Sequence, residues 1–127
     1  MTYEVSFHQK PTYLHAVVTG RNSKENVIRY LEDVLRECSS HGYHRVLIEE
    51  RLEGPRLGTL DIYTIVSRAA GQASGLLRAV AYVDVNSEGS LMRFAETVAL
   101  NRALPVAVFS SVADAEGWLL AADPRIP

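Results

Sequence analysis

Apolar and polar residues alternate along the first part of the chain. The alternation runs over residues 3–8 and again over residues 13–18, where every second position is apolar. A period of two is typical of a strand with one covered face. The two runs are separated by a short segment that contains Pro11, so they predict an antiparallel hairpin whose second strand ends at Gly20.

Farther along, apolar residues recur three or four positions apart, and this spacing predicts helices. Asn22, followed by Glu25 three residues later, predicts the N-terminal cap of the first helix, and Gly42 predicts its C-terminal cap. Four helical segments are expected: 22–42, the segment from Thr59 to "GQASG", 90–103, and the segment that begins at Ser110 or Ser111.

Short apolar runs lie between the predicted helices, namely "RVLI", "LLRAVAYVDV" and "PVAVF". Such runs are expected of strands that are covered on both faces. The order of elements is β-β-α-β-α-β-α-β-α, and alternating strands and helices imply crossover connections and a mostly parallel sheet. The sequence therefore predicts an α/β fold with a five-stranded mixed sheet, an antiparallel N-terminal hairpin and four helices.

Composition narrows the class of protein. The 127 residues suffice for one domain, which we expect to span 1–122 with a short tail over 123–127. Lys and Arg number 13 against 15 Asp and Glu, and the resulting net charge of −2 gives no reason to expect nucleic-acid binding. No apolar stretch approaches the roughly 20 residues of a membrane span, and the alternating N-terminus resembles a strand rather than a signal peptide. With a single cysteine, these features predict a cytoplasmic protein.

Binding sites of open α/β sheets collect beyond the carboxyl ends of parallel strands. Three segments are expected there: Glu49–Thr59, Asp84–Ser90 and Ser110–Ser111. The first is highly charged, and its simpler interpretation is a solvated connection. Hydroxyl groups at the helix starts could bind an anion together with the helix N-terminus, or could serve only as N-caps. The candidate binding residues are Arg51, Glu53, Arg56, Thr59, Asp84, Asn86 and Ser87.

Motifs for nucleotides and metals are absent from the sequence. Neither GxGxxG nor GxxxxGK[ST] occurs. His41 and His44 flank a predicted helix end without a second ligand pair, so we expect no zinc site. Cys38 continues the apolar stripe of the first helix and is expected in the core rather than as a nucleophile. We therefore expect neither a metal nor a cofactor.

Two long stretches carry a family resemblance. "GRNSKENVIRYLEDVLRECSSHGYHRVLIEER" and "RFAETVALNRALPVAVFSSVADAEGWL" are similar to the SpoIIAA-like branch of the STAS superfamily (sulfate transporter and anti-sigma-factor antagonist domains). The likeness extends from about Tyr3 to Leu120. It implies a (βα)n superhelix with sequential strands and a non-enzymatic role, in which the chain binds a protein partner or a small apolar or anionic ligand. A homodimer is a further hypothesis.

The resemblance also singles out one hydroxyl group. Anti-sigma-factor antagonists of this superfamily are switched by phosphorylation of a serine at the start of the helix that follows the third strand. Thr59 is the positional counterpart, although "LGTLD" lacks the Asp-Ser context of the family motif. Thr59 is thus a candidate phosphorylation site on the strength of the resemblance.

The alternative is a small cytosolic enzyme in which Glu49 or Glu50 pairs with Asp84 at the strand edge. General acid–base catalysis requires such carboxyl groups to lie close together, with one pKa shifted. Clustering of these carboxyl groups would favour the enzyme, whereas an apolar groove between helices would favour the binding module. A homo-oligomer with a purely structural role is a third hypothesis.

Overall fold

The structure is a computed structural model of the 127-residue chain. It describes residues 2–73, 75–84, 89–102 and 104–121, with the backbone alone over 89–92. The predicted tail over 123–127 lies outside the described residues.

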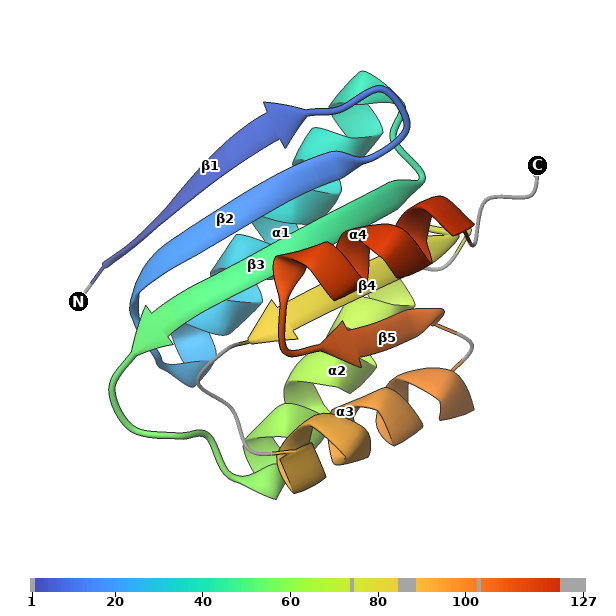
Figure 1. Cartoon of the computed structure of the whole chain (residues 1–127). Coiled ribbons are helices and arrows are strands. Elements are labelled where there is room, and N and C mark those ends of the chain that lie inside the picture. The colour runs from blue at the N-terminus through green and yellow to red at the C-terminus, as the bar shows by residue number, and fades with distance from the viewer. Residues whose placement is uncertain (1, 74, 85–88, 103, 122–127) are drawn as a thin grey trace.

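Strands and helices follow the predicted order (Figure 1). The strands β1 to β5 pair in sequential order, with β1 antiparallel to β2 and every later pair parallel. This confirms the five-stranded mixed sheet with an antiparallel hairpin and four helices. The elements are β1 (Tyr3–Gln9), β2 (Leu14–Arg21), α1 (Lys24–His41), β3 (Arg45–Glu53), α2 (Thr59–Ala73), β4 (Ala79–Asp84), α3 (Gly89–Asn101), β5 (Val106–Phe109) and α4 (Val112–Ala121).

The helices are divided unequally between the two faces of the sheet. Figure 1 shows α4 alone on one face and α1, α2 and α3 on the other. Successive side chains of β3 point to opposite faces of the sheet, so this strand contributes to the core on both faces. Ile48 packs with residues of α1 and α2, whereas Leu47 packs with Ala115 and Leu119 of α4. The three-helix face therefore holds the larger core.

Helix α1 is capped at both ends by the local sequence. Ser23 has an extended backbone, and its Oγ accepts a hydrogen bond from the Asn26 N–H at 3.1 Å. The predicted cap at Asn22 is therefore wrong by one residue. The Asn22 side chain instead donates to the Pro55 carbonyl at 2.8 Å and so anchors the loop before α2. Gly42 ends the helix as predicted, with a φ of 73° that favours glycine.

Strand β3 is longer than the apolar run that predicted it. It continues through the charged residues to Glu53, because all of β2 pairs with it, from Leu14 beside Val46 to Arg21 beside Glu53. The interpretation of 49–53 as part of a solvated loop is wrong. Glu49 and Glu50 are strand residues with only 6% and 5% of their surface exposed.

Candidate functional site

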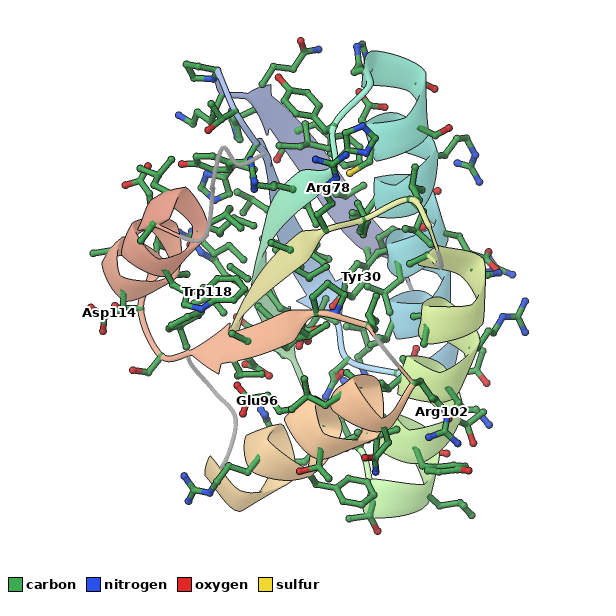
Figure 2. The ribbon with its side chains drawn as sticks, turned by 90° about the vertical axis from the view of Figure 1, so that its right-hand side faces the viewer. Tyr30, Arg78, Glu96, Arg102, Asp114 and Trp118 are labelled. Atoms are coloured by element: carbon green, nitrogen blue, oxygen red, sulfur yellow. The ribbon has the colours of Figure 1, made fainter. Side chains whose placement is uncertain are left out.

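A pocket of about 160 Å³ lies between the sheet and the three helices α1, α2 and α3. Most of its wall is aliphatic and includes Leu31, Val34, Ile65, Val66, Ala95 and Val108. Tyr30 extends from α1 into the space between the helices and the sheet (Figure 2). The pocket thus lies within the larger core and leaves a space there that a small molecule can occupy.

Polar groups gather at the end of the pocket that lies at the carboxyl edge of the strands. Six lining residues carry them. They lie in the C-terminal halves of β3 and β4, follow β2 or β3, or reach the edge from α1: Asn22, Tyr30, Glu50, Arg56, Tyr82 and Asp84. Parallel pairing brings these segments together, because Glu50 of β3 lies beside Asp84 of β4. This is the edge at which open α/β sheets place their ligands.

Glu50 is the centre of the polar end. Its Oε2 accepts a hydrogen bond from the Tyr82 hydroxyl at 2.5 Å and another from the Tyr30 hydroxyl. The two hydroxyl oxygens are 3.2 Å apart. Tyr30 is fully buried, so this arrangement is held inside the core rather than at the surface.

The environment of Glu50 favours its protonated form. Burial is the main cause, and it raises the pKa of Glu50 to about 7. The hydrogen bonds from Tyr30 and Tyr82 act in the opposite direction, whereas the charge and hydrogen bond of Asp84 raise the pKa further. Glu50 therefore exchanges its proton near neutral pH.

The two tyrosines remain protonated donors. Burial and the carboxylate charge of Glu50 raise the pKa of Tyr30 well above its usual 10, and they do the same for Tyr82. Neither hydroxyl can serve as a base near neutral pH.

Arg56 lies at the mouth of the pocket. Its guanidinium is 3.3 Å from Asp84 Oδ2, and 38% of its side chain is exposed. The Asp84 side chain is only 9% exposed. With Asn22 holding the Pro55 carbonyl, this ion pair fixes the loop between β3 and α2 beside the polar end.

A second polar cluster occupies the other face of the sheet. Glu49 Oε1 is 3.0 Å from His15 Nε2, and the Arg51 Nε donates to Glu49 Oε2 at 2.7 Å. The His8 ring lies next to His15, with ring centroids 5.7 Å apart. Because β3 alternates, this cluster is separated from the pocket by the sheet itself.

The structure divides the predicted binding residues into groups. Arg56 and Asp84 lie together at the pocket, whereas Arg51 belongs to the opposite face. Glu53 is exposed at the end of β3, and Thr59 is exposed as the first residue of α2. Asn86 and Ser87 lie outside the described residues.

Only one of the two glutamates that were expected to pair with Asp84 does so. Glu50 interacts with Asp84, whereas Glu49 faces the α4 side and cannot join them. Sequence reasoning missed Tyr30 and Tyr82 as site residues. The available signal was the position of Tyr30 between Val27 and Val34 on the apolar stripe, where a hydroxyl group needs a buried partner.

Neither a metal-binding cluster nor a membrane-spanning helix occurs among the described residues. Among them, no group of three or more His, Cys, Asp or Glu side chains is arranged to hold a metal ion. No helix within the described ranges has the length and hydropathy of a membrane span.

Comparison with known proteins establishes the fold class. No protein-family model matches the chain, and no curated protein matches it. Among solved structures, it is similar to an uncharacterized protein of the DUF3478 family with a SpoIIAA-like fold from Shewanella loihica PV-4. The TM-score is 0.57 at 13% identity, over 93% of this chain and 94% of that one. The chain therefore has a SpoIIAA-like fold, as the sequence resemblance indicated.

Proposed function

We propose that the chain is a non-enzymatic binding module of the STAS type whose pocket takes a small apolar ligand. The observation that carries this proposal is the aliphatic pocket of about 160 Å³ between the sheet and three helices. An apolar cavity of about 150 Å³ is large enough to bind benzene. The pocket therefore matches a ligand with one ring or a short branched chain.

The pocket also has the form that ligand sites usually take. Such sites combine mostly apolar walls with a few polar groups that orient the ligand. Here Glu50, Tyr30 and Tyr82 supply those groups at one end, and Leu31 and Val66 contribute to the apolar wall. This arrangement supports a ligand with an apolar body and one polar group.

Partner binding is a separate part of the proposal. We place the partner-facing surface at the carboxyl edge of the strands, where Glu53 and Thr59 are exposed and Arg56 is partly so. An anionic group of a partner would lie there, near the start of α2, and not inside the pocket. The further expectations of one domain over 1–122, a cytoplasmic location and a homodimer belong to the same proposal.

Binding of toluene tests the pocket, because its single ring matches the volume. Titration followed by NMR should shift signals of residues that line the pocket. Ala69 lines the pocket on α2, and Ala69→Leu should fill part of it and weaken binding. Ala113→Leu, at an exposed position of α4, is the matched control and should leave binding unchanged. Binding that ignores Ala69→Leu, or no binding, would contradict the proposal.

A second candidate is the small acid–base enzyme, and one observation favours it. Glu50 has its pKa raised to about 7 and pairs with Asp84 beside an apolar pocket, as a general acid or base requires. Native mass spectrometry of protein from its host cells would identify a retained ligand. Incubation of that ligand with fresh protein separates the candidates, since a binder returns it unchanged and an enzyme returns a new mass.

A further inference from the structure

We infer that the pocket selects an apolar cation, namely a small aromatic or aliphatic molecule with a protonated amine that lies against Glu50 and Asp84. This inference rests on the proposed function, because it specifies the ligand class of the same pocket. It follows from the hydrogen-bonding roles and charges of the polar end.

Among the described residues, the hydrogen-bond donors nearest Glu50 already have partners. The hydroxyl groups of Tyr30 and Tyr82 both donate to Glu50, and the amide nitrogen of Asn22 donates to the Pro55 carbonyl. Arg56 directs its guanidinium at Asp84. Beside Glu50, the capacity that the polar end offers to a ligand is therefore accepting: carboxyl and phenol oxygens. A ligand group that complements it must donate.

Charge at the polar end favours a positive ligand. Among the described residues that line the pocket, two carboxyl groups, Glu50 and Asp84, face one guanidinium, that of Arg56, so these three groups carry one excess negative charge when all are ionised. Arg56 sits at the mouth, while Glu50 is 5% exposed and lies farther inside. A ligand carboxylate would meet two like charges in a poorly solvated space, whereas an ammonium group would balance the cluster.

Binding of a cation should release the proton of Glu50 to solvent. Near and below pH 7 Glu50 holds a proton, because its pKa is raised to about 7 by burial and by Asp84. An ammonium ligand stabilises the carboxylate form, so Glu50 loses that proton to solvent as the cation binds. Tyr30 from α1, Tyr82 and Asp84 from β4, and Arg56 from the loop are the titratable groups that face it. The affinity should therefore increase as the pH rises through 7.

A series of ligands with one ring tests the charge preference. Toluene, benzyl alcohol, benzylamine and benzoate have similar apolar bodies but differ in charge and donors. We expect benzylamine to bind at least about tenfold more tightly than benzyl alcohol at pH 8, as a hydrogen-bonded charge pair predicts. The advantage should shrink several-fold at pH 6, and benzoate should bind more weakly than toluene. Calorimetry in buffers of different ionisation enthalpy should detect proton release at pH 6.

Glu50→Gln removes the charge and keeps an oxygen that can accept from both tyrosines. It should abolish the preference for benzylamine over benzyl alcohol. If that variant does not fold, Asp84→Asn replaces it, and the pH series needs no variant. The inference is overturned if benzoate binds as tightly as benzylamine, or if benzylamine keeps its advantage in Glu50→Gln.

The same series separates the two proposals. If toluene binds but the amine has no advantage, the pocket proposal survives and the cation inference is wrong. If no member of the series binds, the pocket proposal fails and the cation inference fails with it. Tight amine binding that is insensitive to Ala69→Leu places the amine outside the pocket and overturns the inference.

Discussion

Glu49 and Glu50 are adjacent in β3, yet their carboxyl groups are buried on opposite faces of the sheet. Glu49 pairs with Arg51 and contacts the His15 ring, whereas Glu50 accepts from two neutral hydroxyl groups beside an apolar pocket. One strand thus supplies a neutralised carboxylate to one face and a protonatable carboxyl group to the other. The second is the group whose charge a ligand can change.

Glu50→Gln should change how stability depends on pH. Folding raises the pKa of Glu50 from 4.5 to about 7, so the folded protein holds the proton more tightly than the unfolded chain does. The resulting stabilisation is fully present below pH 4.5 and is lost as the pH rises through 7. The difference corresponds to about 3–4 kcal/mol, because each pKa unit is worth about 1.4 kcal/mol.

Urea denaturation at pH 5 and pH 8 measures this effect. Relative to the wild type, Glu50→Gln should gain on the order of 2–3 kcal/mol between the two pH values. Glu53→Gln, at the exposed end of the same strand, is the control. Parallel stability profiles for the wild type and Glu50→Gln would show that Glu50 does not titrate in this range.

Arg56→Gln and Arg51→Gln should have different effects on the pocket. Arg56 offsets the negative charge of Asp84 at the mouth, so its removal should strengthen benzylamine binding several-fold. Arg51 pairs with Glu49 behind the sheet, and its removal should leave that affinity unchanged. Titration of both variants at pH 8 checks this, and equal effects would contradict the assignment of the two arginines to separate faces.

The sequence predicted the fold well, because strand and helix periodicities are local properties. Gly42 was located from cap chemistry, and the start of α4 was narrowed to Ser110 or Ser111, of which Ser111 accepts from the Asp114 N–H at 3.2 Å. The site was harder to predict. Burial of Glu50 depends on Tyr30 and Tyr82, which lie 20 and 32 residues away in the chain. Local charge density instead indicated a solvated loop.

Leu14→Ala should destabilise the protein by about 2–5 kcal/mol, since Leu14 is fully buried between the sheet and α1. Leu100→Ala is the matched control, because Leu100 is 64% exposed on α3 and should change stability by less than about 0.5 kcal/mol. Chemical denaturation of both variants gives the comparison. Similar midpoints would show that the core packing around β2 is misassigned.

Cys38 should react slowly with thiol reagents under native conditions. It is fully buried on α1, and burial, with a smaller contribution from the charge of Glu37, raises its pKa to about 12. Labelling with a chromogenic disulfide at pH 8 should become fast only in denaturant. Ser39→Cys introduces a thiol at the exposed neighbouring position and should react at once. Equal rates for Cys38 and the introduced thiol would contradict this placement.

Variants of Thr59 test whether the start of α2 is a phosphorylation switch. The Ile62 N–H donates to the Gly58 carbonyl at 3.1 Å, so Gly58 occupies the cap position and Thr59 is the first helical residue. Thr59→Ala should therefore cost less than about 0.5 kcal/mol, below the usual cost of losing a cap. Thr59→Glu places a negative charge at the positive end of the helix dipole and should stabilise α2 by about 0.3–1 kcal/mol.

The same two variants report on partner binding. A phosphate on Thr59 would add a charge of about −1.5 to −2 beside Arg56 and Asp61, at the exposed edge proposed for a partner. Thr59→Glu mimics part of that charge and should release protein partners that Thr59→Ala retains, as judged by quantitative mass spectrometry of proteins captured from host cells. Thr64→Glu, on the same helix but beyond its first turn, controls for added charge alone. If Thr59→Ala and Thr59→Glu capture the same partners in the same amounts, phosphorylation at Thr59 is not a switch.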